Sequence, residues 1–185
     1  GRHRPATNRP AETIEEHLKP LIGKLFAWLV VLAATCFNAA SANDAFSIKN
    51  IGLDLARDLA TEAVNTCRKK GYQVSAVVVD RNGLLRVAMR DDLAPRFTLQ
   101  ISEEKANLAV MAGTSSGDFR NRRHDIRAEM NHLDGIIVME GALEIIAGGS
   151  RLGAIGVSGA PGGDIDRACA QAALDKYAER LEFIE

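Results

Sequence analysis

Two runs of β-branched and apolar residues, YQVSAVVVD and LLRVAMRD, follow one another with only Arg81, Asn82 and Gly83 between them. Asn-Gly strongly favours a tight hairpin turn, because both residues tolerate the positive φ angles that such a turn requires. Strands joined by so short a turn pair antiparallel, since a parallel connection needs a crossover of a dozen or more residues. The sequence therefore predicts a β-hairpin over residues 72–91 and disfavours a fold of alternating strands and crossover helices.

Helical and strand-like patterns flank this hairpin in a definite order. Before it, apolar residues repeat at helical spacing from Ile51 to Cys67, and Gly71 ends the pattern after a basic turn. After it, we expect a helix over 98–114, one or two short helices in the polar segment 115–135, three strand-like runs over 135–159 and a last helix over about 164–182. The order α-β-β-α-α-β-β-β-α predicts an α+β fold, with an antiparallel sheet of about five strands flanked by helices.

The segment before the first predicted helix has the pattern of an export signal. Lys24 precedes an apolar run from Leu25 to Phe37, and Ala40-Ser41-Ala42 fits the small-residue pattern of a cleavage site. The run of about 13 apolar residues is shorter than the roughly 20 that a membrane-spanning helix needs. We therefore expect residues 1–23 to be an upstream segment, residues 24–42 a signal peptide and residues 43–185 a single mature domain.

That interpretation predicts a periplasmic or secreted protein with no stable membrane span after cleavage. The alternative is that the apolar run is a buried core helix. In an oxidising compartment Cys67 and Cys169 could form a disulfide, whereas buried free thiols fit their helical surroundings equally well. No Cys-x-x-Cys-His motif occurs in the sequence, so covalent c-type heme attachment is excluded.

Composition and one near-motif narrow the function classes. The formal net charge is −1, so no overall field favours nucleic acid or an anionic membrane. An aromatic content of 5% is low for a protein that stacks bases. Ser158 lies in GVSG, but Ala160 replaces the last glycine of the Gly-x-Ser-x-Gly nucleophile motif. We expect no nucleic-acid partner, assign no catalytic residue and favour a binding protein over an enzyme.

The segment SGAPGGD, residues 158–164, follows a predicted strand and begins the last helix. Backbone N–H groups at a helix N-terminus attract anions, which makes Ser158 and Gly159 candidate ligand-binding residues. The loop matches neither the phosphate-binding loop of nucleotide hydrolases nor the dinucleotide-binding fingerprint, and Asp164 would compete with a bound anion. A tight strand-to-helix turn without a ligand is the alternative.

Several motifs occur in a fixed order: AVVVDRNGLLRVAMRDD, EEKANLA, EGALEI, and RLGAIGVSGA followed by ACAQAAL. Over residues 51–181 the chain resembles the GlcG/HbpS family of small heme-binding proteins, which also includes the C-terminal domain of the PduO adenosyltransferases. The resemblance implies an antiparallel sheet flanked by helices, a homo-oligomer, and a pocket for a small-molecule ligand near the subunit interface. In several relatives that ligand is heme, so we expect non-covalent heme as the cofactor.

The family pattern can be compared position by position around DDLAPRFT, residues 91–98. Phe97 occupies a position where relatives often have a histidine, and Lys105 matches the family's Lys-Ala in the second helix. EGALEI keeps the glycine, leucine and isoleucine of the family's commoner Gly-Gly-Leu-Pro-Ile but lacks its proline. The candidate ligand-binding residues are Asp92, Arg96, Phe97, Thr98, Lys105, Arg120, Ser158 and Gly159.

An iron ligand has to come from elsewhere if Phe97 replaces the family histidine. Of the two histidines after the expected cleavage site, His124 and His132, we take His124 as the candidate, because the arginines at 120, 122 and 123 beside it could pair with heme propionates. Phe97 would stack on the porphyrin. Two alternatives stay open: an accessory protein or enzyme of small organic-acid metabolism that binds a glycolate-like carboxylate at the glycine-rich loop, and a structural oligomer without a ligand.

Overall fold

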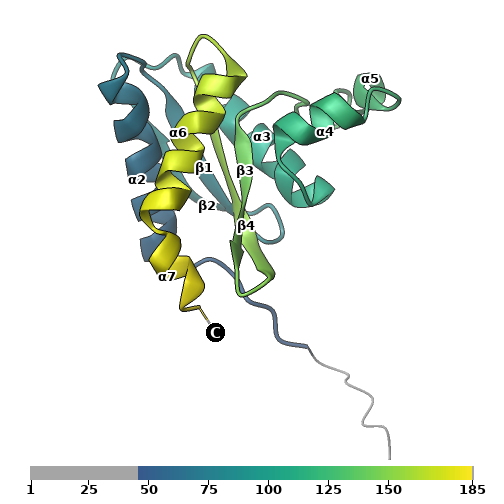
Figure 1. Ribbon diagram of the computed structural model, residues 1–185. Coiled ribbons are helices and arrows are strands. Elements are labelled where there is room, and N and C mark those ends of the chain that lie inside the picture. The colour runs from purple at the N-terminus through teal and green to yellow at the C-terminus, as the bar shows by residue number, and fades with distance from the viewer. Residues whose placement is uncertain (1–45, 185) are drawn as a thin grey trace, which may run out of the picture. The chain divides into compact units, whose positions relative to one another are not determined.

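The computed structural model describes residues 46–184, and within this range the residues from Ser47 onward form one compact unit (Figure 1). The predicted upstream segment 1–23 and signal peptide 24–42 lie outside the described residues. The elements in chain order are α2 (Leu53–Lys69), β1 (Ser75–Asp80), β2 (Leu85–Arg90), α3 (Phe97–Ala112), α4 (Ser116–Arg122), α5 (Arg127–Met130), β3 (Ala142–Ala147), β4 (Ser150–Ser158), α6 (Gly163–Lys176) and α7 (Ala178–Glu182).

The predicted hairpin is confirmed as β1 and β2, which pair antiparallel from Ser75 opposite Arg90 to Val79 opposite Leu85. Gly83 has a φ of 81°, whereas Asn82 does not have a positive φ, so only the glycine of the Asn-Gly pair adopts the left-handed conformation. β1 also pairs antiparallel with β4, so the strand order is β2-β1-β4-β3. The α+β fold with an antiparallel sheet is therefore as predicted.

Within residues 46–184 the sheet has four strands, not the five or so expected from the sequence. The first of the three strand-like runs, residues 135–140, does not join the sheet, because its amides are bonded locally. The Val138 N–H donates to Asn131 Oδ1 at 2.9 Å, and the Met139 N–H donates to the Ile137 carbonyl at 3.0 Å. Gly141, with a φ of 133°, then turns the chain into β3.

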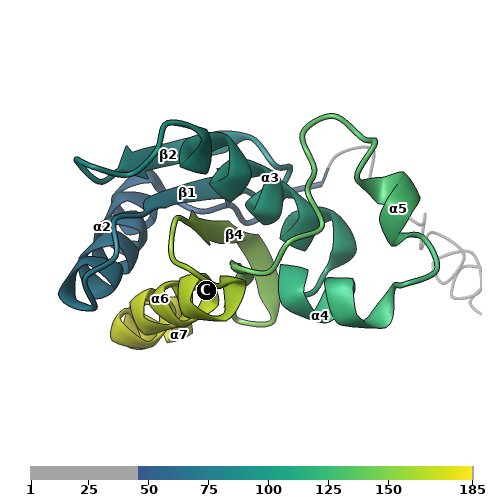
Figure 2. The same cartoon turned by 90° about the horizontal axis from the view of Figure 1, so that it is seen from above.

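Helices cover both faces of the sheet (Figure 2). α2 and α6 pack on one face, where the largest group of buried apolar side chains includes Leu59, Ile145 and Ile155. α3 packs on the other face against a smaller group that includes Val77 and Val79. The β1 and β4 strands are buried on both faces, which explains why their sequences do not alternate between apolar and polar residues.

The segment that contains α4 and α5 forms a further layer on the outer side of α3. Phe119 of α4 and Val138 are buried against Leu108 of α3, and Ile126 and Met130 pack on the same cluster. Figures 1 and 2 both show α5 away from α2 and α6, on the far side of α3. One or two short helices were predicted for this polar segment, and the structure has two.

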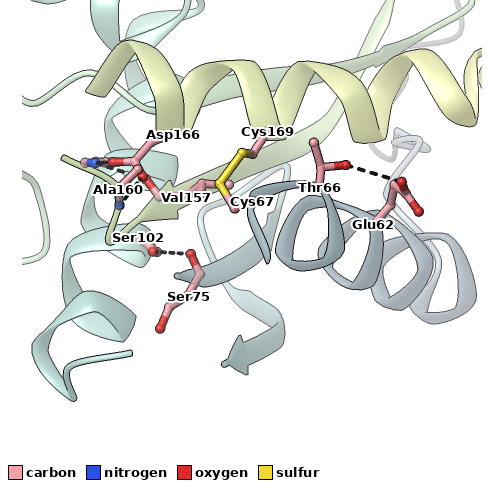
Figure 3. Close-up of a disulfide and its surroundings, with 10 residues drawn as sticks. Glu62, Thr66, Cys67, Ser75, Ser102, Val157, Ala160, Asp166 and Cys169 are labelled. Carbon is pink, nitrogen blue, oxygen red and sulfur yellow. Dashed lines mark hydrogen bonds and ion pairs between the residues drawn. A yellow bond between two sulfur atoms is a disulfide. The ribbon is translucent and has the colours of Figure 1, made fainter. Parts of the chain in front are cut away.

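Cys67 of α2 and Cys169 of α6 form a disulfide, which decides between the two possibilities that the sequence left open (Figure 3). Two ion pairs also connect α2 with the C-terminal helices: Glu62 pairs with Lys176 of α6, and Asp58 pairs with Arg180 of α7. The predicted last helix is interrupted at Tyr177, so α6 and α7 are separate helices. None of the helices in residues 46–184 is both long and apolar enough to cross a membrane.

Candidate functional site

Hydrogen bonds hold the first turns of α3 against the N-terminal end of β1. The hydroxyls of Thr98 and Ser75 are hydrogen-bonded at 2.7 Å. The Ser102 hydroxyl donates to the Ser75 carbonyl at 3.0 Å, as Figure 3 shows. Ser75 also lies opposite Ser158 in the β1–β4 pairing. Two predicted site residues, Thr98 and Ser158, are therefore brought together here, and both are buried.

Lys105, one turn further along α3, is 1% exposed and fills an interior position. Its ammonium group donates to the Val157 carbonyl at 2.9 Å and to Asp166 Oδ2 at 2.9 Å, while Asp166 Oδ1 accepts the Ala160 N–H at 3.0 Å. Burial lowers the pKa of Lys105 and raises the pKa of Asp166, although the opposite charge of the partner favours the ionised form of each. The pair links α3, the end of β4 and α6.

Groups of the protein itself already contact or hydrogen-bond the glycine-rich loop between β4 and α6. Gly159 has a φ of 133°, and a Cβ there would lie 2.7 Å from the Gln73 carbonyl, so the residue serves a close backbone approach. The Ala160 N–H is already bonded to Asp166. Asp164 Oδ1 lies 2.3 Å from the position of a Cβ at Gly162, which places a carboxylate over the start of α6.

Three other predicted residues are exposed at the start of α3. Asp92 and Arg96 point to solvent, and Phe97 is 57% exposed, with the Arg96 guanidinium 4.1 Å from the centre of its ring. Beside them Asp91 is buried and accepts two hydrogen bonds from the Arg68 guanidinium, which holds the pKa of Asp91 below its usual range. This pair anchors the loop that carries the exposed residues.

The exposed face of α3 that begins with Phe97 continues into a pocket of about 560 Å³. Gln100 and Glu104 follow Phe97 at i+3 and i+7, so the three side chains share one face of the helix, and the Gln100 amide donates to Glu104 at 2.8 Å. The opposite wall comes from α5 and the segment after it. We call this the α3–α5 pocket; it is lined by Gln100, Glu104, Arg127, Asn131, Leu133, Asp134 and residues 135–139.

Arg120 and His124 do not line the α3–α5 pocket. Arg120 is half-buried in α4, and His124 is exposed just after α4, next to the ion pair between Arg123 and Asp125. His132 lies in the chain between two lining residues, Asn131 and Leu133. The pocket is thus lined by the start of α3, by α5 and by residues 131–139, and the 120–124 segment does not contribute to it.

The lining residues after α5 were not predicted from the sequence, because that segment has no regular period and its apolar run IIVM was assigned to a strand. The available indication was the turn dipeptide Asp134-Gly135 directly before that run, where Gly135 has a φ of 80°. Within residues 46–184 no group of three or more histidine, cysteine, aspartate or glutamate side chains is arranged to hold a metal ion.

Comparisons with known proteins agree with this architecture. Residues 51–175 match the family model described as "Haem degrading protein HbpS-like". The crystal structure of HbpS is similar at 30% identity with a TM-score of 0.69, covering 75% of this chain and 97% of that chain. Protein ORFY of Klebsiella pneumoniae, a DUF336 protein, is 25% identical with a TM-score of 0.68, covering 77% and 98%.

A third solved structure, named as the PduOC:Heme complex, is 22% identical with a TM-score of 0.63 and covers 68% of this chain and 94% of that chain. At this identity the likeness establishes the shared fold alone. A search of curated proteins gives no match.

Proposed function

The chain belongs to the HbpS-like family, and from this premise we propose that it is a periplasmic or secreted protein that binds heme reversibly in the α3–α5 pocket. The observation that carries the proposal is the family match over residues 51–175, whose description names heme degradation. The PduOC:Heme complex adds a protein of the same fold that is named with this ligand.

Part of the lining of the α3–α5 pocket suits a flat apolar ligand that carries carboxylates, and the rest is polar and includes the carboxylates of Glu104 and Asp134. Its volume of about 560 Å³ lies within the range of small-molecule sites. Leu133 and Met139 are large apolar side chains of the lining and are partly exposed, and Phe97 extends the same α3 face. Arg127 offers a guanidinium suited to a propionate, and Arg96 offers a second one next to Phe97.

An axial ligand for heme iron would come from the segment around α5. Neither histidine is among the residues that line the pocket. We propose His132 as the iron ligand because it lies in the chain between the lining residues Asn131 and Leu133, and we keep His124, with its arginine neighbours, as the alternative. Heme, when bound, would supply a redox-active iron. The residues named here bind and orient the ligand; we assign no catalytic role to any of them.

The disulfide supports the proposed location. Structural disulfides persist in oxidising compartments such as the periplasm and are rare in the cytosol, and Cys67 and Cys169 are joined across α2 and α6. Cleavage after Ala42 would leave a mature chain that begins at Asn43. Mass spectrometry of protein exported by its native host tests this: recovery of a soluble chain that keeps residues 1–42 would contradict the proposed export.

The alternative ligand, a small carboxylate at the glycine-rich loop, is less well supported. An anion there would have to displace the Asp164 carboxylate from the start of α6 and compete with Asp166 for the Ala160 N–H. Both replacements exchange one negative group for another, so the loop gains little by binding an anion. We therefore place the ligand beside α3.

Titration of the purified protein with hemin tests the heme proposal. We expect a saturable shift of the Soret band, and we expect Arg127→Ala to weaken binding by roughly ten-fold, since charge-assisted hydrogen bonds contribute about 1.5–3 kcal/mol when desolvated and less when exposed. Arg57→Ala is the matched control, because Arg57 is an exposed arginine of α2 outside the pocket lining. Absence of saturable binding by the wild-type protein would refute the proposal.

The histidine variants locate the iron ligand. If His132 ligates, His132→Ala changes the position of the Soret band and weakens affinity, while His124→Ala leaves both unchanged. The reverse result would move the iron ligand to the end of α4 and away from the α3–α5 pocket. Light scattering on the same samples tests the proposed homo-oligomer, which a monomer mass at micromolar concentration would contradict.

A further inference from the structure

The outer edge of β3 borders a groove that the heme proposal does not use. Among residues 46–184, β3 is the last strand of the sheet and pairs with β4 on one side only. The groove has a volume of about 590 Å³, and its walls come from α6 and α7 on one side and the start of α4 on the other. We propose that this groove is the docking site for an extended, lysine- or arginine-rich segment of a partner protein, which adds a strand to the edge of β3.

The backbone of β3 has hydrogen-bonding groups available on this edge. The Ala142 N–H points away from β4 and is bonded to the Ser116 hydroxyl at 3.0 Å. Because the direction of N–H groups alternates along a strand, the Glu144 amide two residues further on points to the same side, beyond the reach of Ser116. A strand added here would pair with the β3 backbone, as in peptide recognition by strand addition.

The groove offers apolar contacts for alternate side chains of such a segment. Leu143, Leu174 and Leu181 line it, and Ile146 at the edge of β3 is 50% exposed. An exposed apolar residue on a sheet edge is a liability that proteins usually avoid with charges or prolines. Because Ile146 lies in this groove, a bound partner would cover its exposed side chain.

The charges of the groove select the kind of partner. Four carboxylates and one guanidinium line it. The guanidinium, Arg167, lies 3.7 Å from Glu140 outside the groove, and Glu144 is paired with Arg151. Within residues 46–184 no cation lies within ion-pair distance of the other three carboxylates, those of Asp118, Asp175 and Glu182.

The same charges disfavour a second copy of this chain as the occupant. Two β3 edges paired around a two-fold axis would bring the unpaired carboxylates of both copies to one interface. Like charges placed together at an interface cost free energy and exclude the wrong partner. A segment that alternates basic and apolar residues satisfies the edge, the apolar contacts and the charge together.

Fluorescence anisotropy with a labelled five-residue peptide, lysine and valine in alternation, tests the proposal on the mature protein. We expect saturable binding at low ionic strength that weakens as salt is added, and at least ten-fold weaker binding of the peptide with glutamate in place of lysine. A lysine peptide methylated on alternate backbone nitrogens keeps the charges but loses the N–H donors, and we expect it to bind more weakly than the unmethylated peptide.

Variants of the protein place the peptide in the groove. The double variant Asp175→Asn/Glu182→Gln should bind the lysine peptide roughly two- to ten-fold more weakly, since exposed ion pairs each contribute modestly. Asp164→Asn/Glu179→Gln, which removes two exposed carboxylates outside the groove, should bind as the wild type does.

Three results would overturn the proposal: equal binding of the lysine and glutamate peptides, unchanged binding by Asp175→Asn/Glu182→Gln, or dissociation of a wild-type oligomer by the lysine peptide. The last result, measured by sedimentation, would mean that a second copy occupies the groove.

Discussion

Lys105→Met is expected to destabilise the protein strongly, because it leaves a buried carboxylate without its cation. Asp166 is 3% exposed and would keep only the Ala160 N–H as a partner. Breaking a buried ion pair by removing one member costs about 3–5 kcal/mol, a large part of the roughly 5–15 kcal/mol that stabilises a typical domain. For a domain of this size we expect the midpoint of thermal unfolding to fall by roughly 10–20 °C.

Removing both charges should restore part of that loss. In Lys105→Met/Asp166→Leu no unpaired charge stays in the interior, and the remaining deficits are the Ala160 N–H without its acceptor and the Val157 carbonyl without the Lys105 donor, about 1–3 kcal/mol each at most. Urea unfolding followed by far-ultraviolet circular dichroism gives the free energy for each variant. Lys70→Met, at an exposed position, is the matched control. A single variant as stable as the wild type, or a double variant no more stable than the single one, would refute this account of Lys105.

Three further changes are expected to lower stability, each measurable by urea unfolding. Replacing both Cys67 and Cys169 by alanine should cost up to about 4.7 kcal/mol, because the disulfide closes a loop with a sequence separation of 102 residues; equal stability of the wild type with and without reductant would contradict this. Asp91→Asn should cost about 1.5–3 kcal/mol at pH 7. The pKa of Asp91 is lowered in the folded state, so its stabilisation is complete above about pH 4 and is lost as the pH falls through the folded-state pKa. The free energy of unfolding of Asp91→Asn should therefore decline less steeply below pH 4 than that of the wild type. An equally steep decline in the variant would refute this role of Asp91. Gly156→Ala should cost about 1–3 kcal/mol or more, because its Cβ would lie 2.0 Å from the Ser102 carbonyl. Gly52→Ala has open space and should cost less, since it loses only the preference of the α2 N-cap for glycine over alanine.

The fold could be predicted from the sequence wherever local chemistry determines structure. Asn82-Gly83 forces a tight turn, and the pairing of β1 with β2 follows from it. Residues 136–140 were assigned to a strand because isoleucine, valine and methionine look alike in strands and in apolar loops. The hydrogen bond from the Val138 N–H to Asn131 Oδ1 depends on how the segment folds back on itself, which no local sequence pattern reveals.

The site was harder to predict for a related physical reason. Lys105 was expected to face a ligand, because a lysine in a family motif normally indicates a functional contact, and lysine is almost never fully buried unless it is paired. Its partner Asp166 lies 61 residues away in the sequence, so only the folded chain reveals the pair. The disulfide was equally undetermined, since two cysteines in helices are compatible with both a bond and free thiols.

α3 has an inner face that is bonded to the rest of the domain and an outer face that is not, and adjacent residues of the helix lie on opposite faces. Lys105 points into the interior with Ser102 and Thr98, whereas Glu104 lines the α3–α5 pocket with Gln100. An inner face fixed by an ion pair and hydroxyl contacts keeps the outer face rigid, which favours binding because less freedom is lost when the ligand arrives. Substitutions at the two adjacent positions should therefore separate stability from affinity.

Glu104→Ala should leave the free energy of unfolding measured in urea within about 0.5 kcal/mol of the wild type, as expected for a partly exposed position, and should change hemin affinity. Lys105→Met should lower the midpoint, and its folded fraction should bind hemin with the wild-type affinity once the titration is made at low temperature, where the variant is folded. If instead Lys105→Met lost affinity while folded and Glu104→Ala did not, the ligand would lie on the inner side of α3, and the assignment of the α3–α5 pocket would be wrong.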